Sequence, residues 1–201
     1  MKVETLVLGP MGNCTYIISD NGNAVVIDPS WDMPVINEHL KDLKLSAVFF
    51  THGHFDHVKD VEPFLKAHNI KAFIEVNDLP VSRLSTDIVQ TFEGEQKMNI
   101  DGFDIEILHT PGHSEGSVCI KIGNNLFTGD TLFPGACGRV DLPNSNARKM
   151  RQSLYRLSQL PLEIKIYAGH GYGPNDSSTS TIGRERETNI YMLNSIRDLG
   201  R

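Results

Sequence analysis

Closely spaced histidine and aspartate residues are the chemically distinctive feature of this sequence. The stretch THGHFDH, residues 51–57, holds His52, His54, Asp56 and His57, although the whole chain has only eight histidines. It directly follows the apolar run AVFF. Imidazole and carboxylate groups are the ligands that borderline cations prefer in proteins. A metal site is therefore the first hypothesis for this segment.

Three further stretches repeat the same design, each running from an apolar strand into a glycine-bearing turn. IEILHTPGHSEG supplies His113, NNLFTGD supplies Asp130 and IKIYAGH supplies His170. Strand ends are rigid platforms, and functional side chains concentrate on the loops that leave them. We expect all four stretches to contribute to one site.

The number of candidate ligands predicts two cations. His52 and His54 are two positions apart in an extended segment and project to one side, whereas Asp56 and His57 lie where the chain turns into a helix. We therefore predict a first cation on His52, His54 and His113, a second on Asp56, His57 and His170, and Asp130 bridging the two. The alternative is a set of unrelated surface or core residues, but one metal centre accounts for all seven together.

Hydrophobic patterning indicates the elements that must position these side chains. Strands are expected at 3–8, 14–19, 23–28, 47–50, 71–76, 104–109, 117–122, 124–129 and 164–169, and helices at 33–43, 59–67, 148–159 and 184–199. Strands and helices mixed in this order predict an α+β protein with layered sheets covered by helices. Periodicity alone does not fix how the layers are arranged.

Length, composition and charge restrict the class of protein. A chain of 201 residues with 39% hydrophobic content fits one compact domain over 1–201. Its formal net charge of −6 disfavours a nucleic-acid partner and leaves a small-molecule substrate as the default. Neither a secretory signal nor a membrane segment is expected, and Cys14, Cys119 and Cys137 fit reduced thiols in a cytoplasm. The oligomeric state stays open.

The motif THGHFDH, followed in order by His113, Asp130 and His170, resembles the His-x-His-x-Asp-His signature of the metallo-β-lactamase superfamily. The resemblance implies a four-layer αβ/βα sandwich with the metals at one edge between two sheets. The segments LHTPGHSEGS, LFTGDTLF, GACGRVDLP and YAGHGYGP are most similar to short, single-domain enzymes of the glyoxalase II, or hydroxyacylglutathione hydrolase, group. Two-domain members carry an added C-terminal helical domain that helps to hold glutathione. Little chain follows His170 here, which leaves the thiol half of the substrate open.

The expected reaction is hydrolysis of an S-acyl thioester of a small thiol, such as S-lactoylglutathione. Two divalent cations, zinc first with iron or manganese as alternatives, can share a water and lower its pKa towards about 7. The bridging hydroxide would attack the carbonyl, with Asp56 orienting it. An alkyl thiol has a pKa of about 8.5, so the thiolate leaves without a dedicated acid.

Several other residues have two interpretations each. Arg139 stands where the resemblance implies a basic glutathione contact, and it could bind a substrate carboxylate or pair with Asp141. Tyr172 could cover the site or only pack. Asp28 could orient a ligand histidine or cap a turn.

The remaining histidines and Cys137 are expected to have no catalytic part. His39 and His68 should be solvated on helices, and His109 should be structural. Cys137 has no neighbouring base in the sequence that would make it a nucleophile.

Other functions remain open at this point. Persulfide dioxygenases of the same superfamily bind one iron at the positions matching His52, His113 and Asp130. A lactonase or β-lactamase is a further hydrolase alternative. A catalytically silent metal-binding module is the third class.

Overall fold

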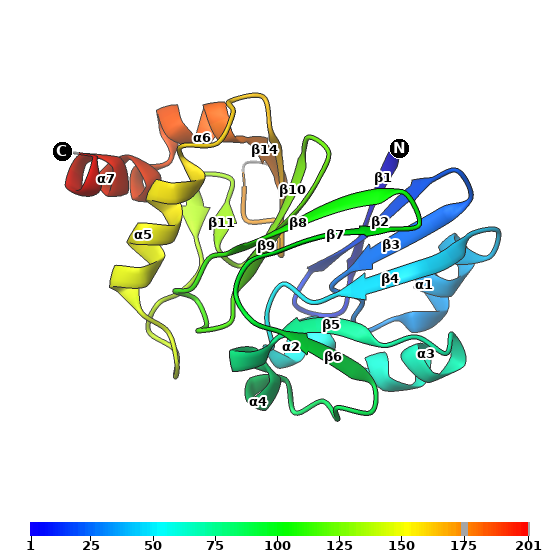
Figure 1. Cartoon of the computed structure of the whole chain (residues 1–201). Coiled ribbons are helices and arrows are strands. Elements are labelled where there is room, and N and C mark those ends of the chain that lie inside the picture. Colours follow the sequence, from blue (N-terminus) through cyan, green and yellow to red (C-terminus); the bar gives the residue numbers. More distant parts are fainter. Residues whose placement is uncertain (174–176, 201) are drawn as a thin grey trace.

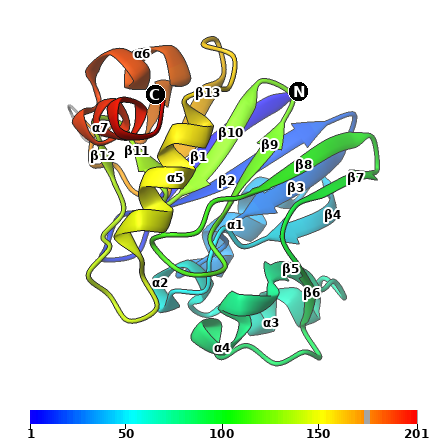
Figure 2. The same ribbon diagram turned by 60° about the vertical axis from the view of Figure 1, so that its left-hand side comes forward.

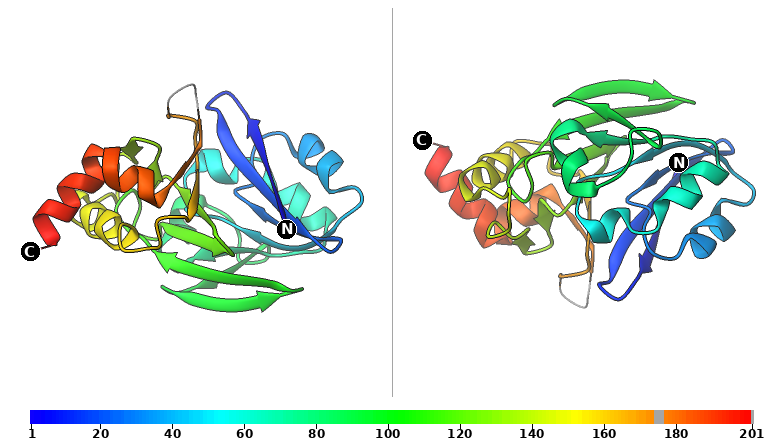
Figure 3. Two further views of the ribbon diagram at one scale, coloured as in Figure 1. Left: turned by 90° about the horizontal axis from the view of Figure 1, so that it is seen from above. Right: turned by 90° about the horizontal axis from the view of Figure 1, so that it is seen from below.

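Two six-stranded sheets face each other, and helices cover the outer face of each sheet (Figures 1 and 3). The computed structural model describes residues 1–173 and 177–200. Helices α1 and α3 lie on one side of the sheet pair, and α5 and α7 lie on the other (Figure 2). This arrangement confirms the four-layer αβ/βα sandwich.

The first sheet has an antiparallel half and a parallel half. Strands β1, β2 and β3 pair antiparallel, and β3, β4, β5 and β6 pair parallel. Their bounds, in the order of the sheet, are β1 (Lys2–Leu8), β2 (Asn13–Asp20), β3 (Asn23–Ile27), β4 (Lys44–Phe49), β5 (Ala72–Glu75) and β6 (Val89–Phe92).

The second sheet is built from the C-terminal half of the chain. Its order is β14 (Thr179–Thr181), β13 (Lys165–Ala168), β10 (Asn125–Gly129), β9 (Val118–Ile122), β8 (Phe103–His109) and β7 (Gln96–Ile100). A separate small hairpin joins β11 (Leu132–Phe133) and β12 (Ala136–Cys137).

The helices are short and connect or cover the strands. They are α1 (Met33–Leu40), α2 (Phe55–Val58), α3 (Val61–Ala67), the 3₁₀ turn η1 (Val76–Asp78), α4 (Leu79–Ser82), α5 (Ala147–Leu157), α6 (Ile182–Thr188) and α7 (Ile190–Leu199). None of the helices among the described residues has the length and apolar character needed to cross a membrane.

Strict alternation along the strands produces the layers. In β4, Ala47 and Phe49 face the core between the two sheets, whereas Val48 and the following Phe50 face α1 and α3. In β9, Val118 and Ile120 face the space between the sheets, whereas Cys119 packs toward α5. Because side chains alternate with a period of two, each sheet buries both of its faces. Three apolar interfaces therefore hold four layers together.

All four predicted helices differ from the structure at their boundaries. The helix expected over 148–159 spans Ala147–Leu157. The other three differ for local reasons. The helix expected over 33–43 ends at Leu40, because the chain must turn back into β4. The helix expected over 59–67 begins at Val61, since Asp60 has a left-handed backbone with φ of 60°. The helix expected over 184–199 is divided at Asn189, whose side-chain oxygen accepts from Tyr191 N–H and Met192 N–H as a cap.

The sequence patterns also missed several short strands. Strands β6 and β7 are only partly buried, and their mixed polar and apolar residues gave little signal. Strands β11, β12 and β14 have two or three residues each. These strands depend on tertiary pairing, which local periodicity does not encode.

Candidate metal centre

The seven predicted ligands converge at one edge of the space between the two sheets. His52 and His54 follow β4, and Asp56 and His57 lie in α2. The other three leave the second sheet: His113 lies in the β8–β9 loop, Asp130 follows β10 and His170 follows β13. The structure thus brings all four sequence stretches together.

The first group consists of His52, His54 and His113, whose nearest ligand atoms lie within 4.8 Å of one another. His54 Nδ1 is 2.8 Å from His113 Nε2. Burial, reinforced by the surrounding imidazoles, holds the pKa of His52 well below its usual value, and burial also lowers the pKa of His54. Both rings are therefore held in the neutral form that binds metal ions.

The second group consists of Asp56, His57 and His170, again within 4.8 Å. Asp56 Oδ2 lies 3.4 Å from His170 Nε2 and 3.6 Å from His57 Nε2. Burial acts to raise the pKa of Asp56, but the His170 contact and the His57 charge outweigh burial and lower it. Burial opposes charge on His57 as well, yet Asp130 and Asp28 raise its pKa well above the usual value. The group therefore carries an ionised carboxylate.

Asp130 lies between the two groups. Its Oδ2 is 3.4 Å from His113 Nε2 in the first group and 3.7 Å from His170 Nε2 in the second, and its Oδ1 is 3.5 Å from His57 Nε2. Burial would raise the pKa of Asp130, but the His57 charge and contact lower it. Asp130 therefore lies where its carboxylate would contact a cation held by either group.

Two buried ligand atoms have no hydrogen-bond partner among the described residues, namely His52 Nε2 and Asp130 Oδ1. Leaving such atoms unpaired costs about 1–3 kcal/mol each, so native proteins rarely do so without a partner such as an ion. The donor set and these two atoms fit divalent cations.

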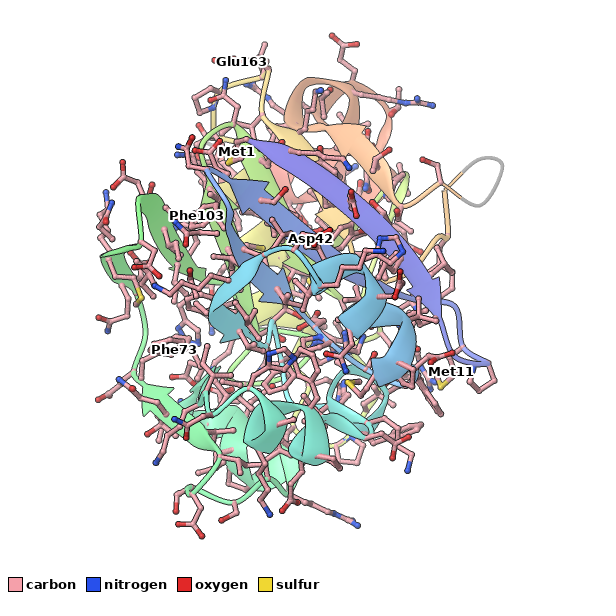
Figure 4. All side chains as sticks on the ribbon, turned by 90° about the vertical axis from the view of Figure 1, so that its right-hand side faces the viewer. Met1, Met11, Asp42, Phe73, Phe103 and Glu163 are labelled. Carbon is pink, nitrogen blue, oxygen red and sulfur yellow. The ribbon has the colours of Figure 1, made fainter. Side chains whose placement is uncertain are left out.

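The outer nitrogens of the ligand histidines are fixed by partners behind the site. His57 Nδ1 lies 2.9 Å from Asp28 Oδ2, His113 Nδ1 lies 3.0 Å from Arg139 O, and His170 Nδ1 lies 3.1 Å from Met11 O. Met11 lies in the turn between β1 and β2 (Figure 4). With Nδ1 engaged, Nε2 of each ring is directed toward the shared space.

Asp28 contacts His57 and orients its ring, which was one of the two roles considered for it. Besides His57, its carboxylate accepts from Thr51 N–H at 2.7 Å and from Thr51 Oγ1–H at 2.6 Å. The carboxylate therefore connects β3 to the start of the THGHFDH segment and fixes the His57 ring.

Asp78 is the main site residue that the sequence reasoning missed. Its buried carboxylate accepts from Gly53 N–H (2.7 Å), Gly116 N–H (2.7 Å) and Ser114 Oγ–H (2.6 Å). It thereby joins the loop of His52 and His54 to the loop of His113. The available signal was a carboxylate soon after the apolar strand KAFIEV, the same pattern that pointed to the ligands.

Asn13 was missed as well. Its side-chain amide donates to Asp56 Oδ2 at 2.8 Å, while Trp31 Nε1–H donates to Asn13 Oδ1 at 3.0 Å. This chain of bonds fixes the orientation of the Asp56 carboxylate. No short-range spacing connects Asn13 to Asp56, so only the fold shows the pair.

A cavity of about 590 Å³ opens onto the two donor groups. Arg139 and Tyr172 line it, together with Arg83. Arg139 also makes the alternative contact, donating to both oxygens of Asp141 at 3.0 and 3.1 Å. Tyr172 stacks on the His170 ring, with ring centroids 5.1 Å apart. It therefore packs against a predicted ligand and also lies beside the cavity.

The remaining histidines lie away from the cavity. His39 is exposed and contacts Glu4, and His68 is exposed and contacts Asn37. His109 Nε2 contacts the Glu115 carbonyl at 2.9 Å. His39 and His68 are thus solvated and His109 makes a structural contact, as expected.

Cys137 should be chemically inert. It lines a separate cavity between α5 and α7, and burial raises the pKa of its thiol to about 11. We expect iodoacetamide to label the native protein slowly at pH 8 and faster as the pH approaches 11, since the thiolate is the reactive form. We also expect Cys137→Ser to keep kcat/KM within about twofold. Rapid labelling of Cys137 at pH 8, with loss of turnover, would contradict this expectation.

Comparison with known proteins shows the family. The model of the metallo-beta-lactamase superfamily matches residues 8–170. The chain belongs to the metallo-β-lactamase superfamily.

Individual relatives cover most of the chain. It is 35% identical to the hydroxyacylglutathione hydrolase GloC of Haemophilus influenzae, over 90% of this chain and 92% of that protein. It is 32% identical to the probable polyketide biosynthesis zinc-dependent hydrolase PksB of Bacillus subtilis, over 90% of this chain and 81% of that protein. The crystal structure of TTHA1623 in a di-iron-bound form has a TM-score of 0.79 at 31% identity, covering 94% of this chain and 99% of that one.

Proposed function

We propose that the chain is a metal-dependent hydrolase that cleaves S-acyl thioesters of a small thiol. The observation that carries this proposal is the convergence of two donor groups with Asp130 between them, 3.4 Å from the first group and 3.5 Å from the second. Two similar proteins, GloC and PksB, are named as hydrolases. The cavity beside the donors has room for a small-molecule substrate.

The residues that would hold two divalent cations are those of the two groups. His52, His54 and His113 would hold one cation, Asp56, His57 and His170 the other, and Asp130 would contact both. Cations bound there would supply a Lewis acid for a carbonyl oxygen and a water of lowered pKa. Imidazole and carboxylate donors suit zinc, iron and manganese, and similar proteins are described as zinc-dependent and as di-iron-bound. Zinc is our first choice.

Side chains of the protein itself would orient the water and the substrate. Asn13 holds one oxygen of Asp56, so this carboxylate would accept a hydrogen bond that orients the attacking water or hydroxide. Asp28 keeps His57 from rotating. Arg139 and Tyr172, which line the cavity, would contact the substrate. The thiol leaving group, with a pKa of about 8.5, departs as thiolate and needs no acid from the protein.

We further propose a cytoplasmic enzyme with no nucleic-acid or membrane partner. The cysteines of the described residues are all free, which fits a reducing compartment. The net charge of −6 gives no broad cationic field that would attract phosphates.

The direct test is thiol release from S-lactoylglutathione by protein of measured metal content. We expect a kcat/KM above about 10⁴ M⁻¹s⁻¹, within the usual range of enzymes. No turnover by protein carrying two metals would reject glutathione thioesters and direct attention to other thiols or to lactones. Oxygen consumption with a thiol persulfide by protein carrying one iron would replace the proposal with the dioxygenase alternative.

His170→Ala should selectively weaken the second cation site. The change removes one of three donors there but none from His52, His54 and His113. We expect elemental analysis after dialysis to show about one metal per chain in the variant and about two in the wild type. Equal loss of both metals would argue against this division of the ligands.

A further inference from the structure

Arg83 lines the cavity beside the two donor groups, although it does not belong to the motif of predicted ligands. It directly follows α4 and is exposed. Its backbone is left-handed, with φ of 57°. This conformation favours glycine or asparagine, so an arginine there is disfavoured by local sterics. Residues kept in such conformations occur preferentially at functional sites.

The backbone next to Arg83 is fixed to the loop that carries His52 and His54. Asp78, just before α4, accepts from Gly53 N–H between the two ligand histidines His52 and His54. Ser82 Oγ closes the end of α4, donating to Leu79 O and accepting from Leu84 N–H. Arg83 therefore extends from a support whose position relative to the metal groups is set.

Arg83 also has no carboxylate of residues 1–173 or 177–200 within ion-pair distance, since it takes part in none of the ion pairs found there. Arg139, which also lines the cavity, is already engaged by both oxygens of Asp141. An arginine without a partner binds carboxylates through paired N–H donors. Of the two arginines on the cavity wall, Arg83 is the one that no side chain of the described residues engages in an ion pair.

We infer that Arg83 is a specificity-determining residue that binds an anionic group, a carboxylate, on the thiol half of the substrate. The inference rests on the proposed thioester hydrolysis and deepens it by naming the substrate class. In this arrangement the acyl carbonyl of the substrate lies at the two donor groups. The carboxylate on the thiol half of the substrate lies against Arg83, across the same cavity. Neutral thiols lack this contact.

The test compares two thioesters of the same acyl group, S-lactoylglutathione with its carboxylates and uncharged S-lactoyl-N-acetylcysteamine. We expect Arg83→Gln to raise KM about five- to tenfold for the glutathione thioester with little change in kcat, because the contact is made equally before and during reaction. KM for the neutral thioester should not change. Arg83→Lys should restore part of the affinity, and added salt should raise KM for the wild type but not for Arg83→Gln.

Arg186→Gln is the matched control, because Arg186 is exposed on α6 and does not line the cavity. It should leave both KM values unchanged. Equal effects of Arg83→Gln on the two thioesters, or no effect on either, would overturn the inference while leaving thioester hydrolysis standing. A wild type inactive on both thioesters would reject the proposed function, and the inference with it. Thermal unfolding at the wild-type temperature would exclude misfolding as the cause of a raised KM.

Discussion

Asp130→Asn should lower kcat by about a thousandfold or more while the fold stays intact. The side chain lies 3.4–3.7 Å from histidine nitrogens of both donor groups, so we propose that it would contact two cations. An amide has the same shape but no negative charge, and it binds cations far more weakly. Loss of one such electrostatic group commonly costs about 10²–10³ in rate, and loss of a bound metal adds to that. Initial rates of thiol release, with metal content measured on the same sample, check the result.

Asp87→Asn is the control for Asp130→Asn, because Asp87 is exposed and does not line the cavity beside the donor groups. It should behave as the wild type. Circular dichroism should show the same fold for all three proteins. An Asp130→Asn protein with two metals and a normal rate would disprove both the bridging position and the proposed chemistry.

Asp78→Ala should lower the free energy of unfolding by about 3–5 kcal/mol. Its carboxylate is fully buried and accepts from Gly53 N–H, Gly116 N–H and Ser114 Oγ–H. Each buried donor left without a partner costs about 1–3 kcal/mol, and the two backbone donors cannot turn to water. Urea unfolding of metal-free protein measures this, since bound metals would add their own stabilisation.

The same change should also weaken metal binding by about 10- to 100-fold, because Asp78 holds the loops that carry His54 and His113 in register. Asp104→Ala is the control: Asp104 is exposed and bonded only to Asn99 among the side chains described. It should change stability by less than about 0.5 kcal/mol. A loss of under about 1 kcal/mol in Asp78→Ala would show that the three bonds do not hold the loops together.

The sequence by itself determined the donor set and the strands that carry it. The segments AVFF at β4 and VCI in β9 are unbroken apolar runs, because both faces of each strand are buried. The ligands follow such strands within a few residues, so their placement at strand ends could be predicted. Asp60 shortened one predicted helix and Asn189 divided another. An amphipathic pattern does not indicate a left-handed residue or an internal cap.

The tertiary structure alone decided which residues meet across the chain. Asn13 bonds Asp56, Asp28 orients His57 and Asp78 joins Gly53 to Gly116, although these partners are separated by 25 to 43 positions. The same holds for Arg83, whose place on the cavity wall follows from α4 packing near α2. Periodicity reports which face of an element is buried, whereas hydrogen bonds between distant loops depend on how the sheets stack. The predicted donors are therefore readable in the sequence, whereas the residues that contact them from distant segments are defined by the fold.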